Sequence, residues 1–254
     1  MIKSKSWSKK LKPIDSKIYD KEYFLKYCCG ATEFTGSNAE KLPKRLQRFI
    51  EVANFKKGQK ILDIGCGRGE VAYHAVKKGC YVTAVDYATE AIKITKNLMS
   101  KLPNKTKKQV IMLRADAKDF KFPQQTFDKI IMADVIEHLQ PWEAKIVVHK
   151  CRGFLKPEGK IIINTSPNVW FLKYAYPILR FFNIALKFND PGPYLECYGE
   201  VHVFEQSPLT LKTLLTGYKT KIWGENFTKS VWLNKIPILN LFAASLFVIA
   251  EKND

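Results

Sequence analysis

Short apolar runs alternate with amphipathic segments along the middle of the chain. Apolar runs bounded by turn residues predict buried strands. They occupy residues 60–64, 81–85, 110–115, 127–133 and 159–165. The segment 71–77, directly after the first run, has the apolar spacing of a helix. Strands that alternate with helices predict a parallel sheet with right-handed crossover connections.

This alternation stops after the fifth run and resumes near the C-terminus. Residues 207–215 predict a helix, with Ser207 as its N-cap and Pro208 at its first position. Two further apolar runs, 218–223 and 245–250, predict the last strands. The expected fold class is therefore α/β, with a Rossmann-like, seven-stranded, mostly parallel sheet that carries helices on both faces.

A leader, residues 1–57, precedes the first strand. Apolar side chains at helical spacing predict a helix over 41–55 within it. An aromatic cluster lies upstream, at Tyr19, Tyr23, Phe24 and Tyr27. These aromatic side chains either anchor the leader to the core or cover a bound cofactor. We expect residues 58–254 to form the main domain, with a helical lid insertion at about 167–206.

A glycine-rich turn joins the first strand to the first helix. Gly65, Gly67 and Gly69 stand at alternate positions, and glycines let a backbone turn tightly and approach a ligand closely. The N–H groups of the following helix point at this turn, as in nucleotide-binding sites. The dinucleotide fingerprint does not fit, because Glu70 stands where it requires a glycine. An ordinary strand–helix turn is the alternative interpretation.

The segment Asp63–Gly69 resembles the D-x-G-x-G-x-G motif of the class I S-adenosylmethionine-dependent methyltransferases. The likeness extends over about residues 45–254, with acidic residues after the second, third and fourth strands. It implies S-adenosyl-L-methionine as the cofactor. The cofactor-binding residues that it implies are Asp63, Gly65, Cys66, Gly67, Gly69, Asp86, Tyr87, Asp116, Ala117 and Asp134.

The segment after the fourth strand, Asp134–His138, resembles the D-V-x-E-H-L sequence of small-molecule methyltransferases, including quinone O-methyltransferases. His138 is the candidate general base. Alternatively, Asp134 and Glu137 form a capping box on the next helix and His138 only packs. Some quinone enzymes associate magnesium with these positions, but we expect no resident metal here. His202 either faces the substrate or has a structural role.

The expected reaction is O-methylation of a small apolar, aromatic or lipid-linked acceptor. The N/D-P-P-Y/F element of enzymes that methylate nucleic-acid amino groups is absent after the fourth strand. Half of the net charge of +18 lies ahead of the glycine turn, so an RNA methyltransferase is one alternative. Lysines greatly outnumber arginines, which disfavours nucleic acid as the partner. A non-catalytic protein that binds S-adenosylmethionine is the other alternative.

Residues 170–188 predict an apolar helix with a narrow basic stripe. Lys173, Arg180 and Lys187 are seven residues apart and fall on one face, while Pro177 kinks or splits the helix. Such a helix either lies in a membrane interface or covers the substrate as a lid with its lysines pointing outward.

The composition fits a packed intracellular domain. An apolar content of 46% is ample for a core. The sequence contains no run of 18 uncharged apolar residues, the length that a membrane-spanning helix needs. The cysteines lack paired C-x-x-C spacing, which favours reduced thiols over a zinc site. We therefore expect a cytoplasmic protein, with peripheral membrane contact through 170–188 as an alternative.

Overall fold

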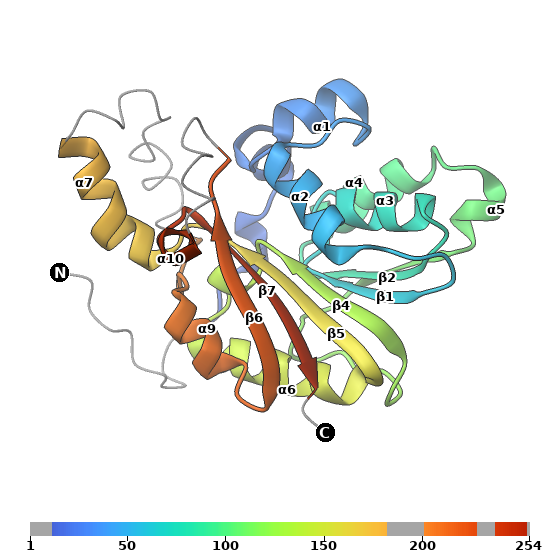
Figure 1. Ribbon diagram of the computed structural model, residues 1–254. Coiled ribbons are helices and arrows are strands. Elements are labelled where there is room, and N and C mark those ends of the chain that lie inside the picture. The colour runs from blue at the N-terminus through green and yellow to red at the C-terminus, as the bar shows by residue number, and fades with distance from the viewer. Residues whose placement is uncertain (1–11, 182–200, 228–236, 253–254) are drawn as a thin grey trace. The chain divides into compact units, whose positions relative to one another are not determined.

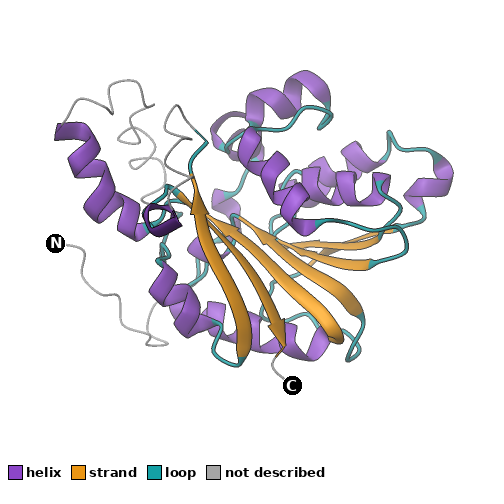
Figure 2. Cartoon of the chain, viewed as in Figure 1, coloured by secondary structure: helices purple, strands orange, loops and turns teal. Residues whose placement is uncertain are grey.

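A single seven-stranded sheet forms the framework of the protein. The structure, a computed structural model, describes residues 12–181, 201–227 and 237–252. The strands follow the order β3-β2-β1-β4-β5-β7-β6, and Figure 2 shows them in orange. Parallel pairing joins β1 to β2 and β4, and β2 to β3, whereas β6 and β7 pair antiparallel. The predicted fold class is confirmed.

The strands agree closely with the apolar runs of the sequence. Their bounds are β1 Lys60–Ile64, β2 Tyr81–Asp86, β3 Val110–Arg114, β4 Phe127–Ala133, β5 Leu155–Thr165, β6 Tyr218–Glu225 and β7 Ser245–Lys252. Only β5 begins well before its predicted start. A Cβ atom on Gly159 would lie 3.0 Å from the carbonyl oxygen of Lys156, so the backbone bends tightly near the start of the predicted run.

Helices connect the strands and precede the sheet. The α-helices are α1 Ala31–Ser37, α2 Lys44–Ala53, α3 Glu70–Lys77, α4 Thr89–Met99, α5 Asn104–Lys107, α6 Pro141–Phe154, α7 Tyr176–Phe181, α9 Pro208–Leu214 and α10 Pro237–Asn240. Short 3-10 segments are η1 Ser16–Ile18 and η3 Ile136–His138, and π segments are η2 Tyr23–Tyr27 and η4 Phe171–Ala175. The leader helix predicted over 41–55 is therefore α2, shortened at both ends.

The chain divides into two compact units. The first, called here the N-terminal unit, comprises Asp15–Ala133 and His149–Ile162. In it α3 packs against β1 and β2, α4 against β2 and β3, and α2 against β4 (Figure 1). The central strands β1 and β4 are almost fully buried, as at Leu62 and Ile131, which is the usual condition of strands inside a parallel sheet. The edge strand β3 is more open, with Ile111 58% exposed.

The second unit, called the C-terminal unit, contains Asp134–Val148 and Ile163–Asn253. Here α9 and α10 lie beside β6 (Figure 1). The Ser207 hydroxyl accepts a hydrogen bond from the Thr210 N–H at 3.1 Å, while the Thr210 hydroxyl accepts from the Ser207 N–H. This reciprocal capping box fixes the start of α9 and confirms the predicted N-cap.

The predicted insertion lies partly within the described residues. Its helix starts as the π segment η4, in which the Tyr176 N–H donates to the Phe171 carbonyl, and continues as α7. Pro177 follows directly and has no N–H to donate, so the change of helix type falls where the sequence predicted a kink. Residues 182–188, including Lys187, lie outside the described residues. Within the described ranges, no helix is both long and apolar enough to cross a membrane.

Gly224 in β6 and Gly36 in α1 form a matched pair for testing the packing of the fold. A Cβ atom on Gly224 would overlap the carbonyl oxygen of Asn240 and lie 2.9 Å from the Ala243 Cβ, whereas nothing lies within 4 Å at Gly36. Gly224→Ala should therefore lower the free energy of unfolding by about 1–3 kcal/mol through overpacking. Gly36→Ala should raise it by about 0.5–1 kcal/mol through helix propensity. Urea denaturation measures both, and equal effects would contradict the packing described here.

Candidate active site

The glycine turn sits at the carboxyl end of β1, between β1 and α3. Because β1 pairs with both β2 and β4, the strand order reverses here, at the position where open α/β sheets bind ligands. Gly67 and Gly69 have φ angles of 52° and 85°, in the left-handed region that favours glycine. A Cβ atom on Gly69 would approach the Thr95 side chain to 2.8 Å. Only glycine fits there without displacing Thr95.

Thr95 of α4 is a residue of this site to which no sequence motif pointed. It is fully buried, and its hydroxyl donates to the Gly67 carbonyl at 2.9 Å. The hydroxyl thus satisfies a backbone group of the turn and holds α4 against it. One sequence signal exists: Thr95 is a polar residue on the helix face that otherwise buries Ala91, Ile92 and Leu98.

Asp63, in β1, carries a buried and incompletely satisfied carboxyl group. The residue is 2% exposed, and its Oδ2 has no hydrogen-bond partner among the described residues. Burial, reinforced by the nearby negative charges of Asp86 and Glu70, raises the pKa of this carboxyl to about 8. At neutral pH the carboxyl group is therefore largely protonated. Its Oδ2 could accept a hydrogen bond from a positively charged ligand.

Asp86, at the end of β2, ties that strand to the glycine turn. Its carboxylate accepts hydrogen bonds from the Gly67 N–H at 3.0 Å and the Ala88 N–H at 2.9 Å. Burial raises the pKa of Asp86, and these backbone bonds oppose the rise. Cys66 is also buried, with its Sγ 3.8 Å from the Thr95 hydroxyl, and burial raises the pKa of its thiol.

The remaining predicted cofactor residues in the N-terminal unit follow β2 and β3. Tyr87 is half-buried. Asp116 accepts from the Lys118 N–H at 3.0 Å and pairs with the Lys118 ammonium at 2.6 Å, while Ala117 is half-buried. All the predicted cofactor residues except Asp134 therefore belong to the N-terminal unit. Asp134 belongs to the C-terminal unit.

The leader is fastened to the glycine turn by Arg68. This arginine is 4% exposed and donates to the carbonyls of Phe24 at 2.9 Å and Cys29 at 2.7 Å. Its guanidinium also pairs with the buried Glu70 at 2.7 Å. Buried charges need such partners, so the turn and the leader stabilise each other.

The aromatic cluster of the leader lies on the predicted cofactor residues. The ring of Tyr19 is centred 5.6 Å from that of Tyr87, and the Phe24 ring would lie 3.7 Å from a Cβ atom on Gly67. Tyr19 and Phe24 are buried, whereas Tyr27 is exposed. The cluster thus anchors the leader, and it does so against the very turn that was predicted to bind the cofactor.

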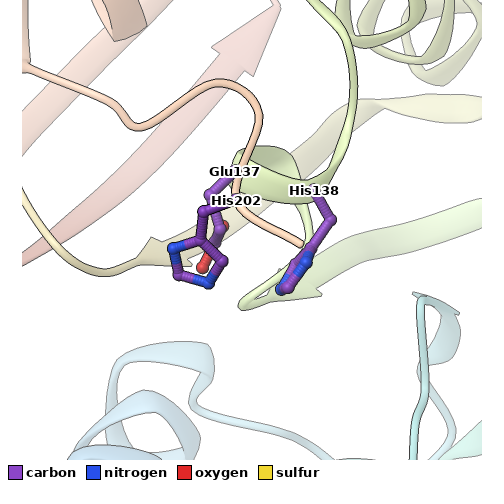
Figure 3. A group of neighbouring side chains, drawn as sticks. All are labelled: Glu137, His138 and His202. Atoms are coloured by element: carbon purple, nitrogen blue, oxygen red, sulfur yellow. The ribbon is translucent and has the colours of Figure 1, made fainter. Parts of the chain in front are cut away.

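A second group of candidate residues lies in the C-terminal unit, at η3 and the segment from Val201 to Phe204. Figure 3 shows Glu137, His138 and His202 with their side chains side by side. The ring centroids of the two histidines are 4.7 Å apart and the rings are perpendicular. The possible metal-ligand atoms of the three side chains lie within 4.8 Å of one another.

The environment of His138 fixes its tautomer. Its Nδ1 lies 2.9 Å from the Val201 carbonyl oxygen. Because a carbonyl only accepts, Nδ1 carries the proton and the lone pair of the neutral ring is on Nε2. Burial lowers the pKa of His138 to about 4, although the charge of Asp134 opposes this shift. The ring is therefore neutral at pH 7.

The capping-box interpretation of Asp134 and Glu137 is wrong. Val135 occupies the N-cap of η3, and no side chain caps that segment. Asp134 adopts a left-handed φ of 54°, which directs its N–H to the Asn164 carbonyl. Glu137 is fully buried, and its carboxylate accepts from the Thr165 hydroxyl at 2.9 Å instead.

The sheet order and the glycine turn at its switch point define the class I methyltransferase fold. A family model described as a methyltransferase domain matches residues 61–159. Residues 61–159 therefore match a methyltransferase domain, which agrees with the resemblance seen in the sequence. The predicted cofactor, S-adenosyl-L-methionine, is the cofactor of that family.

Several known proteins resemble this chain. A ubiquinone biosynthesis O-methyltransferase of Coxiella burnetii is 31% identical over 137 residues, which are 54% of this chain and 55% of that protein. Its namesake in Klebsiella pneumoniae is 28% identical over 133 residues, 51% of this chain and 53% of that protein. The chain thus spans about half the length of these relatives. A solved methyltransferase of Archaeoglobus fulgidus, 24% identical, shares the fold over 89% of this chain and all of that one, with a TM-score of 0.59.

Asp63→Asn should stabilise the protein more at pH 8 than at pH 5. The folded-state pKa of about 8 exceeds the ordinary value of about 4, so the stability that the protonated group provides is lost as the pH rises between these values. An amide stays neutral throughout and removes this loss. Thermal unfolding of the variant and the wild type at both pH values measures the difference.

Asp128→Asn is the control of opposite sign. Burial raises the pKa of Asp128, but the bonds from Lys156 and the Lys60 N–H outweigh burial and lower it. Wild-type stability from this group is thus present above the ordinary pKa of a carboxyl, and the variant should be less stable at pH 8. A stability difference for Asp63→Asn that does not change with pH would contradict the raised pKa.

Proposed function

We propose that this chain transfers a methyl group from S-adenosyl-L-methionine to the oxygen of a small aromatic, apolar or lipid-linked acceptor. The observation that carries the proposal is the glycine turn at the switch point, flanked by two buried acids, Asp63 and Asp86. The cofactor supplies an electrophilic methyl group on a sulfonium. The protein needs only to bind it, orient the acceptor and take up a proton.

The residues of the turn fit a positively charged ligand. The glycines allow its close approach, and the unsatisfied Oδ2 of Asp63 offers an acceptor within a buried site. A cation next to Asp63 would offset the cost of charging that carboxyl. Asp86, Tyr87, Asp116 and Ala117 are proposed to complete the cofactor site. The assignment of Asp134 to it stays a prediction.

His138 is the proposed general base. In this role Nε2 of His138 would take the proton of the acceptor hydroxyl when that oxygen is methylated. A pKa of about 4 keeps Nε2 unprotonated at neutral pH but makes it a weak base. A weak base suits an acidic hydroxyl such as a phenol, with a pKa of about 10, better than an aliphatic alcohol. This favours a phenolic acceptor.

The relatives support oxygen as the methylated atom. Those of Coxiella burnetii and Klebsiella pneumoniae are named O-methyltransferases of ubiquinone biosynthesis. Their likeness to this chain covers only about half of their length, so they support oxygen as the methylated atom without identifying the acceptor. An RNA methyltransferase and a non-catalytic cofactor-binding protein remain the competing functions.

His138→Asn should lower methyl transfer by about 100- to 10,000-fold, the usual contribution of a general base, and leave cofactor binding intact. His149→Gln, which changes an exposed histidine of α6, should have no effect. Wild-type activity should fall only as the pH drops towards 4, where His138 becomes protonated. The measurement is transfer of labelled methyl groups into lipid, small-molecule and RNA extracts.

The distribution of the label decides between the functions. Label in the lipid or small-molecule fraction, lost in His138→Asn, agrees with the proposal. Label in RNA alone would establish the competing enzyme. Binding of S-adenosyl-L-methionine without label in any fraction would leave a non-catalytic protein.

Peripheral membrane contact through η4 and α7 is proposed as the route to a lipid-linked acceptor. Trp170, Tyr174 and Ile178 are spaced four residues apart and share one helix face. Tyr174 and Ile178 are 45% and 58% exposed, with the exposed Lys173 adjacent. Exposed apolar side chains beside a basic one favour a lipid interface.

Ile178→Asp should weaken flotation of the protein with anionic liposomes, because it places a charge on the apolar face. Leu209→Asp is the matched control, since Leu209 is 63% exposed on α9. Flotation at low and high salt reports the contact. A wild-type protein that stays soluble at both salts, or equal losses in the two variants, would refute membrane contact through this face.

A further inference from the structure

We propose that Glu137, His138 and His202 form a binding site for one divalent transition-metal ion of the Zn²⁺ type. The three side chains converge from two chain segments (Figure 3), and their ligand atoms lie within 4.8 Å of one another. The donor set is one carboxylate and two imidazoles. It includes His202, which lies outside the Asp134–His138 segment.

Backbone hydrogen bonds bring the two segments together without a metal. The carbonyl of Glu137 accepts from the N–H groups of Val203 at 2.9 Å and Phe204 at 3.0 Å. The imidazole of His138 donates to the Val201 carbonyl. These bonds flank His202 on both sides in sequence and hold its backbone next to η3.

Two of the ligands are also oriented as metal ligands usually are. The Nδ1–H of His138 is engaged by a backbone carbonyl, which leaves Nε2 to coordinate. The Thr165 hydroxyl donates to Oε2 of Glu137 at 2.9 Å. Carbonyl and hydroxyl partners of this kind fix the tautomer of a ligating histidine and the direction of a ligating carboxylate.

The distances require only a small adjustment on binding. Ligand atoms at about 2.0–2.1 Å from a tetrahedral zinc ion are about 3.4 Å apart, against an upper limit of 4.8 Å for the three atoms here. Side-chain rotation of the imidazoles closes such a gap. Because Glu137 is fully buried, a cation would also offset the cost of its negative charge.

The ligand types select the class of metal. Imidazole nitrogens suit Zn²⁺, Co²⁺ or Fe²⁺, whereas Mg²⁺ prefers oxygen ligands in an octahedron. The site therefore differs from the magnesium set of Asp134, Glu137 and His138 that the quinone enzymes suggest. Three protein ligands leave a coordination position open, as in catalytic zinc sites.

Metal binding and the proposed base role use the same nitrogen. A metal on Nε2 of His138 excludes a proton from it, so the base role belongs to the metal-free protein. The existence of the metal site does not depend on methyl transfer, and it can be tested by binding alone.

The test is a titration of chelator-treated, untagged protein with Zn²⁺, Co²⁺ and Mg²⁺, followed by calorimetry and the visible spectrum of Co²⁺. The protein carries Cys28→Ser and Cys29→Ser, because these neighbouring thiols could bind zinc by themselves. We expect one Zn²⁺ per chain and no comparable Mg²⁺ affinity. Glu137→Gln and His202→Asn should each weaken Zn²⁺ binding more than Thr165→Val, for which the loss of an outer partner predicts about a 10-fold effect.

His149→Gln is the control and should bind Zn²⁺ like the wild type. Thermal unfolding without metal shows which variants are folded. If Glu137→Gln does not fold, the comparison of His202→Asn with the wild type is sufficient for the test. Equal Zn²⁺ affinity in His202→Asn and the wild type, or Mg²⁺ bound as tightly as Zn²⁺, would overturn the proposal. Titration of the same samples with S-adenosyl-L-methionine separates this failure from a failure of the proposed function.

Discussion

The burial of Asp63 next to a tight glycine turn is the constraint on which the N-terminal unit depends. Its carboxyl, with a pKa raised to about 8 by burial, is costly to charge. Asp86 and Thr95 hold the turn from two other elements, and Arg68 holds the leader to it. Hydrogen bonds thus hold the turn from several elements, and a positive charge beside Asp63 would offset the cost of ionising its carboxyl. A cationic cofactor carries such a charge.

The elements of the fold were largely predictable because each depends on local physics. Apolar runs predicted the strands, alternate glycines predicted the turn, and Ser207 predicted the start of α9. Thr95 and Arg68 were not singled out, because their roles arise from contacts with residues 28 and 44 positions away. The capping box failed for a related reason: its local pattern was present, but Glu137 found a partner in Thr165 and Asp134 adopted a left-handed backbone.

The histidine pair shows the limit of motifs more sharply. His138 lies in a recognisable segment, whereas His202 is held beside it by hydrogen bonds between parts of the chain that lie far apart in sequence, such as His138 and Val201, 63 residues apart. Neither residue spacing nor composition predicts the contact between His138 and His202. A neutral His138 with its lone pair on Nε2 can bind either a proton or a metal ion. When the metal is bound, Nε2 cannot take up a proton. The same side chain therefore connects the proposed reaction with the proposed metal site.

The most direct test of the central claim is the number of protons released when S-adenosyl-L-methionine binds. Calorimetric titration at pH 7 in two buffers of different ionisation enthalpy measures it. If the cofactor charges the Asp63 carboxyl, about one proton leaves per cofactor bound, in the wild type and in Asp128→Asn but not in Asp63→Asn. Binding with no proton release in the wild type, or with the same release in Asp63→Asn, would contradict the account.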